Sequence, residues 1–309
     1  MNAIKYILIC GAGMMGKNIA FVMASNPAYQ VGVYDLYETD VPGGIRANTR
    51  QLIAKGALTE EELDARLSRI SFTTDLDSEL VSRADLVIEA VFEDMKIKRE
   101  TFAKLEARCR PDTIFCTNSS VMSPSEISAE LRHRERFVGT HFWTPGHLIP
   151  LVEVVKSDAS SDETAQTVME VLSSAGKEPV LCKKDVPGFI ANRMQHALWR
   201  EAISIVVRGI ADAATVDKAV RYSFGLRLPQ LGPIENADMV GTDLTYNIHD
   251  SIIKDLEDSH EPSPLLTRLR DEGKLGFKTG EGFQTWTPQQ IEQSKEALND
   301  YLVDMLYGK

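Results

Sequence analysis

The sequence has few cysteines, and their spacing excludes the common cysteine-based metal and redox sites. Only four occur in 309 residues: Cys10, Cys109, Cys116 and Cys182. They show neither the ligand spacing of a metal site nor the spacing of a redox motif. We therefore expect reduced cysteines in strands and helices, no metal ion, and a cytoplasmic protein.

Long apolar runs, an excess of basic residues, low-complexity segments and internal repeats are also lacking. No run reaches the ~18 apolar residues that a membrane-spanning helix requires, and the first strand pattern begins so close to Met1 that no signal peptide is expected. The formal net charge of −11 argues against nucleic acid or an anionic membrane as a partner. A small anionic substrate is still compatible with this charge, because local basic residues can hold it.

A glycine-rich stretch near the amino terminus carries the main functional signal. Residues 7–10 form a short apolar run, typical of a strand buried in a parallel sheet, and residues 17–24 read as a helix. Between them, three glycines have the G-x-G-x-x-G spacing. Gly11 permits a tight turn, Gly13 lets the backbone approach a pyrophosphate, and Gly16 lets the helix pack on the strand. The pyrophosphate would bind free N–H groups at the positive end of the helix.

An acidic residue follows at the distance that a dinucleotide site requires. Residues 31–35 read as a second short strand that ends in Asp35, 19 residues after Gly16. A carboxylate at this place accepts hydrogen bonds from the adenosine ribose, whereas the alternative is a turn aspartate in water. Leu36 comes next, with no nearby arginine to pair with a 2′-phosphate. The sequence therefore favours NAD over NADP.

Strand and helix patterns alternate over the first part of the chain only. Further strand patterns cover residues 70–75, 85–91, 113–117, 137–143, 151–155 and 180–182, and a capping-box sequence at residues 59–62 opens a helix. After Pro187 and Gly188 the patterns are helical. We predict an α/β fold: a Rossmann-type, doubly wound, mainly parallel sheet in an NAD-binding domain of residues 1–184, followed by an all-helical domain of residues 185–309.

Two charged residues follow the strand pattern of residues 85–91. Glu93 and Lys98 lie where the next helix begins, at the carboxyl end of the strand, and open α/β sheets bind ligands along these ends. Both are candidates for contacts with the nicotinamide ribose and the phosphates. The alternative is an ordinary helix start in contact with solvent.

His141 and Glu153 form a candidate catalytic pair. His141 lies near the end of a strand pattern, and Glu153 follows twelve residues later in apolar surroundings, where an unpaired carboxylate is costly. If the chain reverses near Pro145, the two side chains meet, and a glutamate that accepts the Nδ1–H makes the imidazole a better base. Ser120 and Asn192 are candidates to hydrogen-bond a substrate oxygen. The alternatives are a histidine satisfied in the core and an edge glutamate.

The ordered set of motifs resembles the L-3-hydroxyacyl-CoA dehydrogenase family over essentially the whole chain. The matching segments are residues 11–16 (GAGMMG), 84–98, 117–120 (TNSS), 141–145 (HFWTP), 151–154 (LVEV), 186–193 (VPGFIANR), 232–235 (GPIE) and 278–282 (KTGEG). So many motifs in one order make a chance match very improbable.

This resemblance implies an NAD-dependent enzyme that acts on CH–OH donors. The implied catalytic residues are His141, Glu153, Ser120 and Asn192. The implied cofactor contacts are Gly11, Ala12, Gly13, Met14, Met15, Gly16, Asp35, Glu93, Lys98, Ser120 and Lys278. The resemblance also implies that the helical domain contacts substrate and forms a homodimer.

The segment between His141 and Glu153 departs from the acyl-CoA enzymes. They typically read His-Phe-Phe-Asn-Pro, whereas this chain has Thr144 before the proline, and Pro150 stands where they tend to have a basic residue. This segment is more similar to relatives that act on free small acids, namely L-gulonate, carnitine and pyridine-carboxylate dehydrogenases. His147, in the same segment, is a spare candidate base beside the site, but we expect a loop histidine that faces water.

The substrate therefore belongs to one of two classes. Arg227 resembles an arginine of the gulonate and carnitine enzymes, and its guanidinium suits a free carboxylate; Arg227, Ser120 and Asn192 are the predicted substrate contacts. Residues 55–60 and 68–70 instead resemble bacterial 3-hydroxybutyryl-CoA dehydrogenases, which favours a CoA thioester. A different class is a non-catalytic protein, either one that only senses NAD or a lens protein such as some relatives are. This chain keeps all four implied catalytic residues, which favours an enzyme. We expect an enzyme that oxidises a small, free hydroxy acid.

Overall fold

The structure, a computed structural model, describes residues 3–308. These residues group into two units: one comprises the chain up to Ala191 together with the segment from Leu298 onward, and the other comprises Asn192–Ala297. The predicted division between residues 184 and 185 differs from this grouping, because the first unit continues to Ala191 and also takes in the end of the last helix. The assignment of functions to the two domains stays a prediction.

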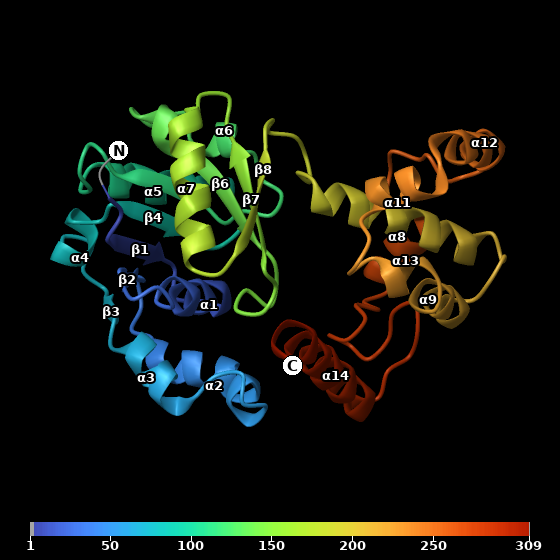
Figure 1. Ribbon diagram of the computed structural model, residues 1–309, viewed down its shortest axis with the longest axis horizontal. Coiled ribbons are helices and arrows are strands. Elements are labelled where there is room, and N and C mark those ends of the chain that lie inside the picture. Colours follow the sequence, from blue (N-terminus) through green and yellow to red (C-terminus); the bar gives the residue numbers. More distant parts are fainter. Residues whose placement is uncertain (1–2, 309) are drawn as a thin grey trace. The chain divides into compact units, whose positions relative to one another are not determined.

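An eight-stranded sheet lies at the centre of the first unit (Figure 1). Its strands have the order β3-β2-β1-β4-β5-β6-β7-β8. Their bounds are Tyr6–Cys10 (β1), Gln30–Tyr34 (β2), Ile70–Thr73 (β3), Leu86–Glu89 (β4), Ile114–Thr117 (β5), Phe137–Phe142 (β6), Leu151–Lys156 (β7) and Glu178–Cys182 (β8). The strands from β3 to β6 are parallel, β7 is antiparallel to β6, and β8 is parallel to β7. The predicted doubly wound, mainly parallel sheet is confirmed.

Helices cover both faces of this sheet. They are Met14–Met23 (α1), Val41–Ala54 (α2), Glu60–Leu67 (α3), Glu79–Ser82 (α4), Met95–Glu106 (α5), Pro124–Ile127 (α6) and Asp162–Ser174 (α7). Because successive side chains of a strand point to opposite faces, Ile7 and Ile9 of β1 enter one core with residues of α1, α2, α3 and α7. Leu8 enters the other core with residues of α4, α5 and α6. In Figure 1, α7 lies across β6, β7 and β8.

Helices α2 and α3 lie between β2 and β3 in the chain, and α3 is the helix that the capping-box sequence predicts. The capping box at the start of α3 is present in full: the Thr59 side chain accepts from the Glu62 N–H, and the Glu62 side chain accepts from the Thr59 N–H. Lys55, at the end of α2, donates to the Asp300 carbonyl at 3.1 Å and to the Asp304 carboxylate at 2.7 Å. The pair is therefore tied to the last helix.

The second unit is built from helices, as predicted. They are Ala191–Val207 (α8), Ala213–Arg221 (α9), Phe224–Arg227 (α10), Pro233–Val240 (α11), Thr242–Ile252 (α12) and Pro264–Asp271 (α13), and α14 (Pro288–Tyr307) begins here and ends in the first unit. Within the described part of this unit, β pairing is confined to isolated bridges between residues 276 and 285. Across residues 3–308, every helix is too short or too polar to span a membrane.

Candidate active site

The predicted site residues of the first unit collect at one edge of the sheet. The glycine loop of residues 11–16 follows β1, Asp35 follows β2, Glu93 follows β4, Ser120 follows β5, and His141 lies near the end of β6. All these strands are parallel, so their carboxyl ends share an edge. The chain order reverses beside β1, which pairs with both β2 and β4, and ligands of open α/β sheets bind at such a reversal.

The geometry of the glycine loop fits a dinucleotide. Gly11 has a φ of +107°, and a Cβ there would lie 2.6 Å from the Ala90 carbonyl oxygen. A Cβ at Gly16 would lie 1.8 Å from the Gly11 carbonyl oxygen, so the helix could not approach the strand. A Cβ at Gly13 would meet nothing within 4 Å. Only glycine therefore fits at Gly11 and Gly16, whereas the space beside Gly13 is open to a ligand.

The start of α1 differs from the starts of the helices that follow it. No side chain caps α1, whereas each helix from α2 to α7 has a capping side chain: Asp40, Thr59, Ser78, Asp94, Ser123 and Ser161. The first N–H groups of an α-helix have no partner within the helix. In α1 they remain available for a phosphate, which the positive end of the helix dipole also favours.

Asp35 is bound to the glycine loop itself. Its Oδ2 accepts from the Ala12 N–H at 2.6 Å, and its Oδ1 accepts from the Tyr37 N–H at 3.1 Å. The carboxylate therefore fixes the loop, a role that the sequence analysis did not foresee. Its contact with the adenosine ribose stays a prediction.

Lys98 is buried between two carboxylates. Its side chain is 1% exposed, and its Nζ lies 2.7 Å from Glu89 Oε1 and 3.1 Å from Glu93 Oε2. Burial raises the pKa of the Glu89 carboxyl, while the charge and hydrogen bond of Lys98 and a hydrogen bond from Thr117 oppose this rise. Because Lys98 is fully engaged inside the protein, the structure shows it as a partner of Glu93, and a direct contact with the cofactor stays a prediction.

Glu93 connects this ion pair to the loop after β5. Its Oε1 accepts from the Ser119 hydroxyl and, at 3.1 Å, from the Ser120 N–H. Burial opposes the ionisation of Glu93, but these hydrogen bonds and Lys98 outweigh it and hold the pKa below its usual value. Asn118, in the same loop, accepts from the Phe142 N–H at 2.9 Å. The loop that carries Ser120 is thus fixed to both neighbouring strands.

The structure brings His141 and Glu153 together. They are direct partners in the antiparallel register of β6 and β7, so their side chains lie on the same face of the sheet. His141 Nδ1 lies 2.8 Å from Glu153 Oε2, and both side chains are buried. The predicted meeting of these two residues is confirmed, and their catalytic roles stay predictions.

Three further donors surround the Glu153 carboxylate. The backbone N–H groups of Ile190 and Ala191, at the start of α8, donate to Oε1 at 2.9 Å each, and Trp143 Nε1 donates to Oε2 at 3.3 Å. Burial favours the neutral acid, but hydrogen bonds from His141, Ala191 and Ile190 outweigh burial and lower the pKa of Glu153. A buried carboxylate with this many donors stays ionised.

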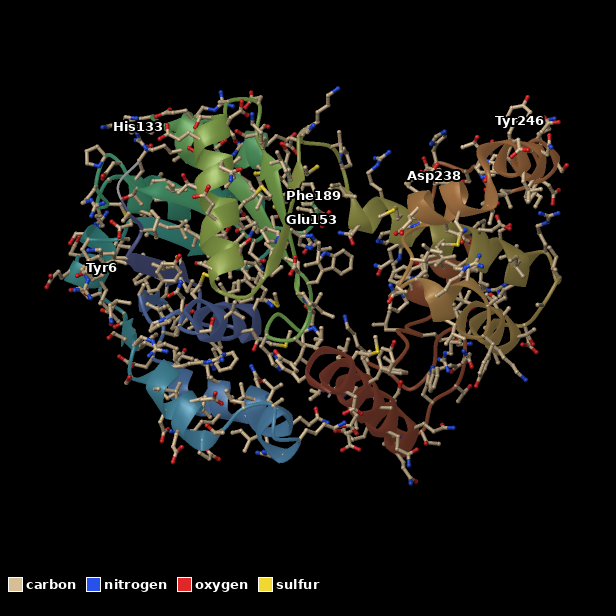
Figure 2. The ribbon with its side chains drawn as sticks, in the orientation of Figure 1. Tyr6, His133, Glu153, Phe189, Asp238 and Tyr246 are labelled. Carbon is tan, nitrogen blue, oxygen red and sulfur yellow. The ribbon has the colours of Figure 1, made fainter. Side chains whose placement is uncertain are left out.

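Phe189 supports the pair from the side of α8. It is buried, its φ is +49°, and its ring centroid lies 5.8 Å from that of His141; Figure 2 shows it beside Glu153. A left-handed conformation is strained for a bulky residue, and here it directs the next two N–H groups to the carboxylate. Residues 186–193 carry a family motif, but their sequence pattern does not predict that Trp143, Phe189 and Ile190 are partners of the pair.

The loop of residues 144–149, between β6 and β7, packs on the start of α1. The Thr144 hydroxyl donates to the sulfur of Met15 at 3.5 Å, and a Cβ at Gly146 would lie 3.1 Å from the Met15 methyl group. His147, expected to face water, is only partly exposed, and its Nδ1 is buried without a hydrogen-bond partner among residues 3–308. Burial and the charge of Lys177 lower the pKa of His147 to about 4.

The other predicted site residues belong to the second unit. Asn192 is its first residue, directly after Ala191. Arg227 ends α10, Lys278 lies between α13 and α14, and both are exposed. Their contacts with substrate and cofactor stay predictions. Within the described chain, no cluster of three His, Cys, Asp or Glu residues has the geometry to hold a metal ion.

Comparison with known families decides the class. The model of the 3-hydroxyacyl-CoA dehydrogenase NAD-binding domain matches residues 6–186, and the model of the C-terminal domain of the same enzymes matches residues 188–286. The chain belongs to the 3-hydroxyacyl-CoA dehydrogenase family. It is therefore an NAD-dependent oxidoreductase that acts on CH–OH donors, and the predicted family, enzyme class and cofactor are confirmed.

Individual relatives within this family divide between two kinds of substrate. The chain is 33% identical to the 5-formyl-3-hydroxy-2-methylpyridine 4-carboxylate 5-dehydrogenase of Mesorhizobium japonicum, over 94% of this chain and 93% of that protein. It is 36% identical to a probable 3-hydroxybutyryl-CoA dehydrogenase of Bacillus subtilis, over 91% and 96%. A crystal structure of the pyridine-carboxylate enzyme, described as an NAD⁺-dependent dismutase, superposes with a TM-score of 0.89 at 31% identity and covers 98% of this chain and 97% of its own.

Proposed function

We propose that this family member oxidises the hydroxyl group of a small, free hydroxy acid, with His141 as the general base. The observation that carries the proposal is the buried hydrogen bond between His141 Nδ1 and Glu153 Oε2, at the sheet edge that also holds the glycine loop. Because Glu153 is ionised and accepts the Nδ1–H, Nε2 carries the lone pair that accepts a proton.

The pair handles one proton in each turnover. The hydroxyl proton of the substrate passes to His141 Nε2, and the charge of the resulting imidazolium is balanced by Glu153. The hydride acceptor for the same carbon is supplied by NAD when it is bound. Ser120 and Asn192 hold the oxygen while it becomes a carbonyl, and the ties from Glu93 to the Ser120 backbone keep that loop in place.

Cofactor binding is assigned to the first unit. The N–H groups at the start of α1 and the open space beside Gly13 accommodate the pyrophosphate, and Asp35 accepts from the adenosine ribose. Glu93 contacts the nicotinamide ribose. Lys98 acts through Glu93, because both of its nearby carboxylate partners are protein groups.

The free carboxylate of the substrate is assigned to Arg227. Its side chain is exposed and makes no ion pair within residues 3–308, so a guanidinium is available for a bidentate carboxylate. Thr144 in place of the family asparagine supports a free acid, as does the free carboxylate in the substrate for which the pyridine-carboxylate relative is named. The second candidate is a 3-hydroxyacyl-CoA thioester, which the Bacillus subtilis relative favours.

A panel of free hydroxy acids and their CoA thioesters, each with NAD, tests the substrate. We expect higher kcat/KM with a free acid, and in Arg227→Met a KM for that acid raised by roughly ten- to a hundredfold, as a lost charge-assisted pair implies. Arg227→Lys should lose less, because it keeps the charge, and the thioester should respond to neither variant. Preference for the thioester in the unmutated protein, unchanged in Arg227→Met, would establish the second candidate instead.

We also propose a homodimer formed through the helical unit. Among the described residues of that unit only Ser204 and Leu269 are buried. Ile234 of α11 is 77% exposed and Tyr246 of α12 is 71% exposed, and Tyr246 projects outward from its helix in Figure 2. Large apolar side chains exposed in such number mark an interaction surface, and a second copy of the chain offers the same apolar face.

The compartment is proposed to be the cytoplasm. All four cysteines are free and buried, and burial raises the pKa of Cys109 to about 12, which keeps its thiol protonated and unreactive. Free thiols of this kind suit a reducing compartment. Fractionation of cells that express the chain, with detection of NAD-dependent activity in each fraction, tests the assignment.

A further inference from the structure

Lys177 is a buried lysine that serves the loop between the two strands of the catalytic pair. It is 5% exposed, and its Nζ donates to two backbone carbonyls of the 144–149 loop, Gly146 and Ile149, at 2.8 Å each. Burial lowers its pKa to about 8. A lysine is seldom buried without a carboxylate partner, so the burial of Lys177 against two backbone carbonyls requires an explanation.

The backbone of Lys177 is itself firmly held. It follows Gly176, whose φ is +78°, at the end of α7, and its N–H donates to the Leu172 carbonyl at 3.0 Å. The next residue, Glu178, begins β8, and its N–H donates to the Pro150 carbonyl at 3.0 Å. The ammonium group is therefore presented from a rigid junction of helix and sheet.

The 144–149 loop connects this junction with the cofactor helix. Within the loop, the N–H groups of Leu148 and Ile149 both donate to the Pro145 carbonyl at 3.0 Å, which makes one compact turn. The turn packs on Met15 in the first turn of α1 through Thr144 and Gly146. Lys177 binds carbonyls at both ends of the turn and holds it against the helix whose free N–H groups are assigned to the pyrophosphate.

We propose that Lys177 is a positioning residue for cofactor and substrate binding: it fixes the 144–149 loop as a wall beside the start of α1. This inference deepens the proposed function and rests on it for the substrate. His141 and Glu153 do not depend on this loop for their contact, because the register of β6 and β7 already places them opposite each other. Loss of Lys177 therefore weakens binding more than it slows the chemical step.

The test compares Lys177→Met with the unmutated protein by NAD titration and by steady-state kinetics with the best hydroxy acid. Met has similar length but no donor, so both carbonyls lose their partner. We expect the Kd for NAD and the KM for the acid each to rise roughly tenfold, as two lost hydrogen bonds from a charged donor imply, while kcat changes less than about threefold. Lys177→Gln, which keeps two N–H donors, should recover part of the binding. Lys183→Met, an exposed lysine after β8, is the control and should leave all three constants unchanged.

A drop in kcat with an unchanged Kd for NAD would overturn the inference, as would a lower melting temperature with unchanged constants. Amide hydrogen exchange of the unmutated protein covers the case in which the variants fail to fold. The Leu148 and Ile149 amides should be protected to the same degree as those of β6, and exchange as fast as in an exposed loop would contradict the proposal. NAD titration and hydrogen exchange need no turnover, so a failed substrate assignment is recognised separately.

Discussion

The two units of the chain differ in how far each is completed by its own residues. The first has two continuous cores on the faces of its sheet, and its buried charges have partners: Lys98 pairs with Glu89 and Glu93, His141 pairs with Glu153, and Lys177 binds two backbone carbonyls. The second buries only two of its described residues and leaves apolar side chains on α11 and α12 in water. In the proposed homodimer, association covers part of this apolar surface.

Because of this difference, we expect substitutions in the two units to act in different ways. The chemistry of the first depends on internal hydrogen bonds, so single side chains should matter there whatever the state of assembly. If the proposed homodimer forms, changes on the surface of the second unit should act through association.

Removing the proposed base should abolish most of the catalytic activity of the first unit without changing association through the second. General base catalysis contributes ~10²–10⁴-fold, so His141→Ala should lose about that much in kcat, with the Kd for NAD and the dimer unchanged. Glu153→Gln should lose a large part of the same factor, because the imidazolium then lacks its counter-charge. Stopped-flow absorbance of NADH formation measures both. A near-normal rate in either variant would remove that residue from the mechanism.

A charge on the exposed apolar face of the second unit should weaken association without changing the catalytic site of the first unit. Ile234→Glu and Tyr246→Glu should each weaken the dimer at least about thirtyfold, the scale of an interface hot spot, measured by sedimentation velocity over a range of concentrations. Glu235→Gln, on the same helix as Ile234, is the matched control and should leave association unchanged. A monomeric unmutated protein at micromolar concentration would contradict the proposed homodimer.

The smallest expected effect is a dependence of the stability of the first unit on pH, caused by His147. His147 has a pKa of about 4 in the folded protein, below its ordinary value of 6.5, so between these values the unfolded chain binds a proton that the folded chain does not. The free energy of unfolding therefore falls as the pH is lowered, by about 1.5 kcal/mol between pH 6.5 and pH 5. Urea unfolding of the first unit, followed by fluorescence of Trp143, measures this fall.

His147→Gln should remove most of that pH dependence, whereas His133→Gln, which changes an exposed histidine, should keep it. An unmutated protein equally stable at pH 6.5 and pH 5 would show that His147 is not a source of acid sensitivity.

Much of the first unit follows from local sequence patterns. The glycine spacing, the apolar strands and the capping box of Thr59 and Glu62 are encoded by neighbouring residues, and all of them appear in the structure. Helix α7 was missed, although Ser161 is a capping residue followed by two acidic residues and the spacing of its apolar residues is helical.

The candidate site was predictable where one strand register determines it and not where distant backbone takes part. His141 and Glu153 meet because a reversal between two adjacent strands leaves few registers. The N–H groups of Ile190 and Ala191 reach Glu153 because Phe189 adopts a left-handed conformation. The sequence of side chains does not predict this backbone conformation. The burial of His147 was missed for a similar reason: its surroundings come from α2 and the end of α7, far away in sequence.

The last helix gives the chain a fixed order of assembly during synthesis. Val303 is 2% exposed within the core of the first unit, and Asp300 and Asp304 bind Lys55 of α2. The ribosome makes residues 192–297 between the sheet and this helix, which takes roughly 5 to 20 s at ordinary elongation rates. Throughout that interval the nascent sheet carries an open apolar site that only the carboxyl-terminal residues close. The first unit is thus completed only after the residues from Leu298 onward have been synthesised.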